Sequence, residues 1–434
     1  MKLSQDLQIK FQKFKSDKRA RYSLMALMIA FFLTLPAELL YNVRPIILVV
    51  DGKPYFPILF TYSEQDFGGP LISEPDYKSQ RFLRILKGEP PEESAGLDLS
   101  DFEEDGAGLS LGLGDFDEGE DEASGSPLVL TLDDFEEDDS VLPLPEPEKA
   151  TLPESPGSAL QARDYWMIWP PVRYDYKYIP SHATTGRVVL AAPYETLSFD
   201  GSKTIPSSWQ DGHYLGTDDR GRDVLARLVY GFRISMIFGL SLAVTGTLLG
   251  CLLGGIQGFF GGLIDLIGQR LTEMWGSIPR LYILIILSAM LAPSALLLFA
   301  ILNLTAWMGM AAYIRAEFLR GRNLEYVKAA KALGVSNFRI MGKHILPNSL
   351  TPVITFFPFE VTAGILALVS LDFLNLGVPS PAPSLGELLA QGKSNLQAIW
   401  ILLPTFAVLT GALTLLTFVG DGIRNAFDPR KAEN

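Results

Sequence analysis

Long apolar runs separated by polar segments dominate this sequence, a pattern typical of helices that cross a membrane. A helix rises 1.5 Å per residue, so about 20 apolar residues cross the roughly 30 Å hydrocarbon layer of a bilayer. We expect six spans, at residues 23–42, about 233–256, 280–293, 294–316, 350–371 and 398–420. The pattern therefore predicts an all-α membrane protein whose core covers residues 232–420.

The first 22 residues form a basic, amphipathic segment. Leu3, Leu7, Phe11 and Phe14 lie at near-helical spacing among seven basic residues, which predicts a short helix on an anionic membrane surface. A cleaved signal peptide is the alternative, but no small-residue cleavage site follows residues 23–42. We therefore expect an uncleaved first span with the N-terminus in the cytoplasm. Six spans also place residues 421–434 in the cytoplasm.

Residues 43–231 contain no further span, so we expect an extracytoplasmic region. Its first part alternates apolar and polar positions around a turn at Asp51 and Gly52, which predicts some β structure. Its second part, from Tyr165, is rich in aromatic residues and suits a membrane interface.

An acidic insert at residues 88–148 interrupts this region. It contains 22 of the 49 acidic residues and no Lys or Arg, so the net charge of −13 belongs to the insert while the remainder is basic. Such a composition predicts disorder, and the calcium-loop pattern of fixed glycine and final glutamate is missing. We hypothesise that it interacts electrostatically with a binding protein or a cationic cargo.

A polar, basic segment, EYVKAAKALGVSNFRIMGKHILPN at residues 325–348, separates the fourth and fifth spans. Its spacing predicts a helix that ends at Gly334 and a second short helix from Ser336 to Pro347. We expect a compact knob with Ala329 and Ala330 at its tip, where small side chains allow another protein to approach closely. Excess positive charge over residues 319–348 predicts a cytoplasmic loop.

The knob resembles the "EAA" loop of permease subunits in bacterial ATP-binding-cassette importers. The resemblance places Ala329, Ala330, Gly334, Leu346 and Pro347 on the motif, and it implies that the knob couples to a cytoplasmic ATPase. The family's usual glutamate falls on Lys328, and Glu325 lies three residues earlier on the same helical face, placed to replace it. A generic basic loop between spans is the alternative.

A second motif precedes the second span. The string GTDDRGRD resembles the GTD-x-x-GRD signature of peptide-type permeases, on Gly216, Thr217, Asp218, Gly221, Arg222 and Asp223. Thr217 and Asp218 also suit a helix cap, and both interpretations can hold together. The extracytoplasmic segments resemble the microcin C and oligopeptide branch of these permeases.

Two further features concern the interior of the membrane. Gly246, Gly250, Gly254 and Gly258 repeat every four residues and predict close helix packing, within this chain or against a sister subunit. Glu360 lies about 15 Å into the fifth span, where a charge costs at least about 2.5 kcal/mol unless it faces protein or water. Glu360 and Asp372 are therefore candidates for the substrate path, although a protonated glutamate that hydrogen-bonds a neighbouring helix is equally compatible.

The sequence carries no pattern for chemistry of its own. The single cysteine, Cys251, excludes an intrachain disulfide, and the three histidines lack zinc spacing. GELLAQGKS, at residues 386–394, mimics a phosphate-binding loop but has five residues between its glycines instead of four and no preceding strand. We expect a non-catalytic subunit with no metal or cofactor of its own.

The family resemblance implies a type I importer permease fold and a bacterial inner-membrane location. It also implies four kinds of partner besides the lipid bilayer: a second permease subunit, two ATPases that hold ATP and magnesium, an extracytoplasmic binding protein, and peptides or peptide-like cargo. Nucleic acid is not expected. A secondary transporter or channel using Glu360 is the alternative function, although no inverted repeat supports it, and a non-transporting anchor is a second one.

Overall fold

The computed structural model describes residues 5–88, 163–179, 189–197, 204–291 and 294–427. The chain divides into two compact units, one formed by Met1–Val49, Lys53–Thr61 and Trp166–Asn434, and the other by Val50–Gly52 and Tyr62–Tyr165. The acidic insert lies, apart from Gly88, outside the described residues, as does His182. The hypotheses about the insert therefore stay predictions.

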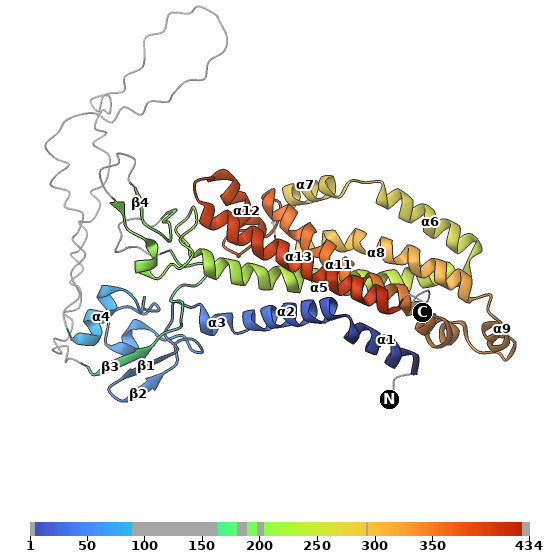
Figure 1. Ribbon diagram of the computed structural model, residues 1–434. Helices are drawn as coiled ribbons and strands as arrows, with labels where there is room; N and C mark the ends of the chain where they lie inside the picture. The colour runs from blue at the N-terminus through green and yellow to red at the C-terminus, as the bar shows by residue number, and fades with distance from the viewer. Residues whose placement is uncertain (1–4, 89–162, 180–188, 198–203, 292–293, 428–434) are drawn as a thin grey trace, which may run out of the picture. The chain divides into compact units, whose positions relative to one another are not determined.

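The larger unit is mostly helical (Figure 1). Its N-terminal helices are α1 (Gln5–Ser16), α2 (Lys18–Thr34) and α3 (Ala37–Leu40). The remaining helices are α5 (Val224–Phe260), α6 (Gly262–Gly276), α7 (Arg280–Met290), α8 (Ala295–Gly321), α9 (Glu325–Ala332), α10 (Asn337–Arg339), α11 (Leu350–Phe373), α12 (Leu385–Ser394) and α13 (Ile399–Phe427). A π-helical turn, Ile340–Ile345, and a 3-10 turn, Leu346–Ser349, join α10 to α11.

The β structure is small. Strands β1 (Ile47–Val50), β2 (Lys53–Tyr55) and β3 (Tyr165–Ile168) form one sheet in the order β2-β1-β3. Strands β4 (Thr196–Leu197) and β5 (Thr204–Ile205) pair antiparallel. The turn at Asp51 and Gly52 connects β1 to β2, and both residues have positive φ, which confirms the expected turn chemistry.

Among the described residues, four helical stretches are long and apolar enough to cross a membrane. They are α5, α8, the continuous stretch Asn337–Phe373 and α13. The two other expected spans are shorter than predicted. Helix α2 ends at Thr34, before Pro36, and the expected span at 280–293 contains only the 11 residues of α7, about 16 Å of helix. Pro36 explains the end of α2, because proline cannot donate the backbone hydrogen bond that would continue a helix.

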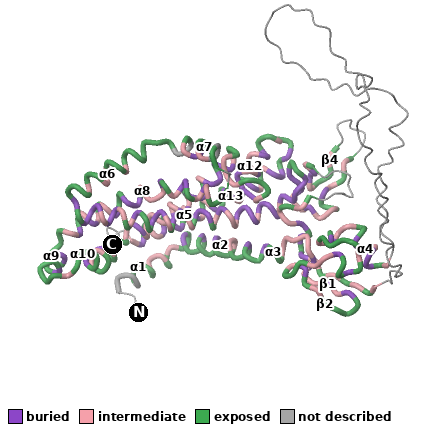
Figure 2. Tube along the Cα trace, turned by 180° about the vertical axis from the view of Figure 1, so that it is seen from behind, coloured by how far each residue is buried: buried purple, intermediate pink, exposed green. Residues whose placement is uncertain are grey.

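Helix α5 forms the centre of the larger unit, with buried residues along its whole length (Figure 2). The glycine stripe packs against α8 of the same chain, which settles the alternative left open by the sequence. A Cβ added at Gly246 would lie 3.1 Å from the Ala306 Cβ, and one at Gly250 would lie 2.7 Å from the Met310 Cβ. Gly254 and Gly258 face Ala311 and Arg315 in the same way. The absence of side chains lets the two backbones approach closely.

The smaller unit has an aromatic core. The rings of Phe67, Tyr77 and Phe82 pack edge to face, and α4 (Gln80–Lys87) supplies the last of them. Glu64 begins the 3-10 turn Glu64–Phe67 and lies 3.5 Å from Arg81. Helix α4 ends at Gly88, whose φ of 74° is typical of a glycine helix cap.

Candidate functional site

The knob is an ordered structure at one end of the helices. Helix α9 ends at Ala332, and Gly334 two residues later has a left-handed φ of 76°, the glycine stop that the sequence predicts. Val327 and Ala330 are buried on its inner face, where they join Ile340, Ile345 and the α5 residue Phe259 in one apolar cluster. The expectation that Ala330 lies at an exposed tip is therefore wrong, because this side of α9 supplies the apolar contacts that hold the knob.

The outer face of the knob exposes large apolar side chains. Leu333 is 83% exposed and Phe338 is 79% exposed, while Ala329 is also exposed. The basic residues Lys331, Arg339 and Lys343 of the knob are exposed as well. Sequence reasoning missed Leu333 and Phe338, because helical spacing alone does not say which apolar residues of a short helix face inward. An exposed apolar face of this kind indicates a contact surface.

The remaining knob residues support this arrangement. The Lys328 Nζ lies 3.1 Å from the Glu325 carboxylate, so these two expected coupling residues pair with each other on an exposed face. Leu346 packs against the apolar cluster, and Pro347 is exposed at the start of the 3-10 turn. The ammonium group of Lys331 lies 4.8 Å above the Phe259 ring of α5.

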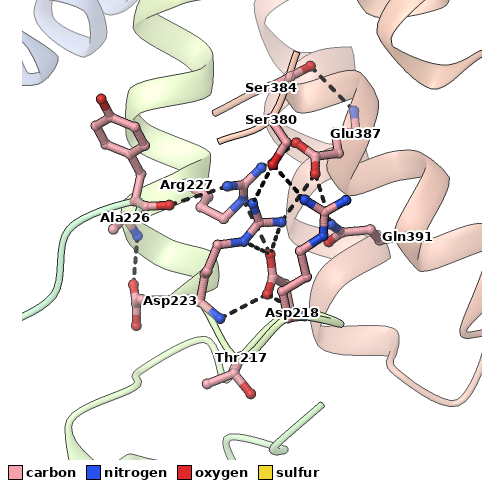
Figure 3. A network of polar contacts seen from close by, with 12 residues as sticks. Thr217, Asp218, Asp223, Ala226, Arg227, Ser380, Ser384, Glu387 and Gln391 are labelled. Carbon is pink, nitrogen blue, oxygen red and sulfur yellow. Dashed lines mark hydrogen bonds and ion pairs between the residues drawn. The ribbon is translucent and has the colours of Figure 1, made fainter. Parts of the chain in front are cut away.

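A buried polar network lies at the other end of α5, about 55 Å away along a 37-residue helix. It includes the signature residues Thr217, Asp218 and Asp223 that precede the second span (Figure 3). Gly216 and Gly221 have positive φ, at 74° and 80°, so glycine suits both turns. The Thr217 hydroxyl accepts a hydrogen bond from the Ala191 amide at 2.8 Å, and the Trp400 indole of α13 donates to the Thr217 carbonyl at 3.2 Å.

Four charged side chains form the centre of the network. Asp218 accepts from the Arg222 amide at 2.8 Å and from the Arg222 Nε at 2.7 Å. Glu387 of α12 accepts from the Arg222 Nη2 at 3.1 Å and from the Arg227 Nη2 at 2.5 Å. The Arg227 Nε also lies 3.4 Å from Asp218, at ion-pair distance. We call Asp218, Arg222, Arg227 and Glu387 the four-charge cluster; its two positive and two negative charges balance.

Burial makes this cluster electrostatically strong. Both arginine side chains and Asp218 are at most 2% exposed, and Glu387 is 16% exposed. Burial alone would lower the pKa of Arg222, but the hydrogen bonds and charges of Asp218 and Glu387 outweigh it and raise that pKa above its ordinary value. The cluster joins the loop before α5 to α12, two segments about 160 residues apart.

The N-cap of α5 is the last signature residue, Asp223. The expectation that Thr217 and Asp218 cap this helix is therefore wrong, because α5 begins only at Val224. The Asp223 carboxylate accepts from the Ala226 amide at 2.7 Å, and its other oxygen lies 2.9 Å from the Nδ1 of buried His213. The Tyr174 ring stacks on His213 with ring centroids 3.8 Å apart. Burial, together with the charges of Asp211 and Asp223, raises the pKa of Tyr174 to about 12. His213 is therefore a core histidine.

The two candidates for the substrate path occupy different settings. Asp372 is buried at the end of α11, where it accepts from the Val378 amide at 2.8 Å and from the Ser384 hydroxyl at 2.5 Å. These hydrogen bonds hold the loop between α11 and α12. Glu360 instead lines a cavity of about 190 Å³ between α5, α8 and α11. The structure thus separates two residues that the sequence placed together.

The phosphate-loop mimic has a helical conformation. Residues 386–394 belong to α12, and Gly386 packs against Val369 and Asp372 of α11. A phosphate-binding loop needs free backbone amides, so this geometry agrees with rejecting the match. Within the described residues, no three His, Cys, Asp or Glu side chains cluster in a way that could hold a metal ion.

Comparison with known proteins assigns the chain to a family. A family model described as the binding-protein-dependent transport system inner membrane component matches residues 246–433. The peptidoglycan transport system permease protein YejE of Agrobacterium fabrum is 38% identical over 428 residues, which cover 97% of this chain and 92% of that protein. The inner membrane ABC transporter permease protein YejE of Escherichia coli K12 is 35% identical over 431 residues, 99% of both chains.

A shorter relative matches the C-terminal part. The dipeptide transport system permease protein DppC of Bacillus subtilis is 37% identical over 223 residues, which cover 50% of this chain and 69% of that protein. The family that the knob and the signature residues indicated is thereby confirmed. This multi-pass membrane protein belongs to the binding-protein-dependent transport system inner membrane components, and it resembles the two YejE proteins along nearly their whole length.

Proposed function

We propose that this chain is a pore-forming permease subunit of an ATP-driven importer for peptides or peptide-like compounds. Family membership supports the permease role, and the relatives named for peptidoglycan and dipeptide transport support the cargo class. The complete importer would contain a second permease subunit, two cytoplasmic ATPases and an extracytoplasmic binding protein. ATP and magnesium would be held by the ATPases, and this chain would carry out no catalysis.

We propose six membrane crossings in total. Helices α2 and α3 would make the first, and α6 with α7 would together make the third, in addition to the four long helical stretches. The Trp400 indole, near the start of α13, donates a hydrogen bond to the Thr217 carbonyl beside the polar network. The start of α13 therefore lies at the network end of α5, and its other end lies on the side of the knob. The Lys10 ammonium of α1 lies 5.2 Å above the Phe427 ring at the end of α13. Both described ends of the chain thus share the side of the basic knob, which we assign to the cytoplasm.

The observation that carries the coupling role is the two-faced knob. Its inner face packs on Phe259 of α5 and Phe318 of α8, whereas its outer face exposes Leu333 and Phe338. An ATPase that grips the outer face would move α5, α8 and α11 together through the inner face. Closure of the ATPase pair on ATP would then switch the helices between outward and inward opening.

Copurification tests this role. The wild-type chain in mild detergent should retain its ATPase subunits, and a double variant, Leu333→Ser with Phe338→Ser, should lose them while remaining folded, because both side chains are exposed. Leu396→Ser is a matched control, since Leu396 is 70% exposed near the opposite end of the helices. Retention of the ATPases by the double variant would contradict the proposed contact.

The relatives give no support to a secondary transporter or channel built on Glu360. Such a protein would work without ATPases, so uptake that persists in proteoliposomes after ATP is exhausted would contradict the assignment as an ATP-driven importer.

A further inference from the structure

A cavity of about 220 Å³ lies at the base of the knob. Its walls come from the end of α8, the start of α9 and the turns that lead into α11. Glu317 and Arg320 of α8 are its ionisable groups. The other lining residues are small, apolar, hydroxyl or amide residues, namely Gly321, Leu324, Tyr326, Ile345, Asn348 and Ser349.

Neither charged group of this cavity has a partner within the part of the chain that the structure describes. Another charged pair of the knob, Lys328 and Glu325, is joined at 3.1 Å. No hydrogen bond or ion pair, by contrast, engages the side chain of Glu317 or Arg320. Glu317 is partly buried and Arg320 is exposed. One acid and one base therefore line the same space without neutralising each other.

The cavity lies where two helices leave the membrane. Helix α8 is a membrane-crossing stretch that ends at Gly321, so Glu317 lies about 6 Å before its end. Ser349, another lining residue, directly precedes α11. This is the level of the lipid headgroups on the knob side, where an arginine near a helix end can reach a phosphate. Pockets between helices at this level, when they carry basic groups, bind lipid headgroups.

An aromatic surface leads from the cavity toward the middle of the membrane. Tyr313 lies four residues before Glu317, on the same face of α8. Its ring is exposed and stacks on the ring of Phe356 of α11, with centroids 4.4 Å apart. An acyl chain can lie on this surface while its headgroup enters the cavity. The cavity has the volume of roughly seven waters at about 30 Å³ each, which suits a phosphate with a short amine arm.

We propose that this cavity binds a phospholipid headgroup that carries a primary ammonium, as in phosphatidylethanolamine, with Arg320 on the phosphate and Glu317 on the ammonium. A guanidinium binds a phosphate through two parallel hydrogen bonds, and an ammonium donates hydrogen bonds to a carboxylate. The zwitterionic headgroup thus satisfies both charges of the cavity. The site goes beyond the importer function and does not depend on it.

The ATPase is a less suitable occupant. One protein side chain brings one charge, which would neutralise only one of the two groups. The exposed face of the knob also lies elsewhere, since Leu333 is about 10 Å along α9 from Tyr326.

Lipid binding by the purified full-length chain in detergent tests this assignment. Lipids with identical acyl chains and an ethanolamine, choline or glycerol headgroup are titrated into it, and the rise of the unfolding midpoint above the lipid-free value gives an apparent affinity. The ethanolamine lipid should bind about tenfold more tightly than the choline lipid, which corresponds to about 1.4 kcal/mol. The reason is that the quaternary ammonium of choline has no hydrogen to donate to Glu317. The glycerol lipid, which has no positive charge, should also bind more weakly than the ethanolamine lipid.

Two variants separate the roles of the two charges. Glu317→Gln should remove the preference for the ethanolamine lipid, whereas Arg320→Gln should weaken the binding of all three lipids because they share the phosphate. Glu273→Gln, at an exposed site on α6, should change neither. Because affinity is measured from the lipid-free midpoint of each variant, a loss of stability alone does not imitate either result.

Three outcomes would overturn the proposal. The first is equal affinity of the wild type for the ethanolamine and choline lipids, or a preference that Glu317→Gln retains. The second is equal stabilisation by soluble phosphoethanolamine, which would assign the cavity to a free phosphate ester. The third is loss of copurifying ATPases from Glu317→Gln while the wild type is indifferent to the headgroup, which would assign the cavity to the ATPase contact. No transport is measured, so each outcome leaves the importer function untouched.

Discussion

The strongest stability prediction concerns the four-charge cluster at the network end of α5. Glu387→Gln keeps the size of the side chain and one acceptor oxygen but removes its negative charge. The two arginines then face Asp218 alone, so one positive charge is left uncompensated at side chains that are at most 2% exposed. Breaking one partner of a buried ion pair costs about 3–5 kcal/mol. With an unfolding entropy of about 2.1 cal/mol/K per residue, 1 kcal/mol shifts the midpoint of a 434-residue chain by about 1 °C, so the unfolding midpoint should fall by about 3–5 °C.

The assay is thermal unfolding of the purified chain in detergent. The fraction of protein that remains monodisperse is measured as the temperature rises. Glu273→Gln is the matched control, because its partner Arg270 lies 2.6 Å away with both side chains more than half exposed. An exposed pair of this kind contributes about 0–1 kcal/mol. Replacing one charge of each sign, Arg227→Met with Glu387→Leu, should restore most of the stability because the remaining pair is balanced. A midpoint for Glu387→Gln equal to that of the control would refute the reasoning.

Three other perturbations test separate parts of the fold. Gly250→Leu should destabilise the contact between α5 and α8 by about 1–3 kcal/mol through overpacking. Gly411→Leu should not, because a Cβ at Gly411 would have no neighbour within 4 Å. Equal unfolding midpoints for the two variants would argue against the glycine stripe as a packing surface. Val327→Ser, at a fully buried position, should unfold the knob and expose it to limited proteolysis, unlike the surface change Leu333→Ser. Asp372→Asn should increase cleavage in residues 374–384 by weakening the bonds to Val378 and Ser384, and an unchanged digest would show that these bonds do not hold the loop.

The apolar periodicity of the sequence predicted the long helices well but not their ends. Runs of apolar residues mark α5, α8, α11 and α13, because each helix must satisfy its own backbone inside the bilayer. The end of α2 depends on Pro36 and the start of α7 on Pro279, and average hydropathy does not register either proline. Glycines at a spacing of four predicted a packing stripe, but only the structure identifies α8 as its partner.

The candidate site was predictable in its motifs but not in its pairings. Gly334 was found because helix ends impose a local rule on sequence, whereas the signature residues were found through their resemblance to a family motif. The inward position of Ala330 and the exposure of Leu333 depend on how the knob packs on Phe259, which no local pattern encodes. Glu387 gave no signal at all, since its partners Arg222 and Arg227 lie about 160 residues away and meet it only after α5 and α12 pack.

The central claim is that the knob faces the cytoplasm and contacts an ATPase, and cysteine labelling in whole cells tests it most directly. Cys251→Ser removes the native thiol, and Leu333→Cys then supplies one reactive group on the exposed face of the knob. We expect labelling by a membrane-permeant maleimide, none by an impermeant one in intact cells, and a crosslink from this position to the ATPase subunit. Labelling of this position by the impermeant reagent in intact cells would contradict the account.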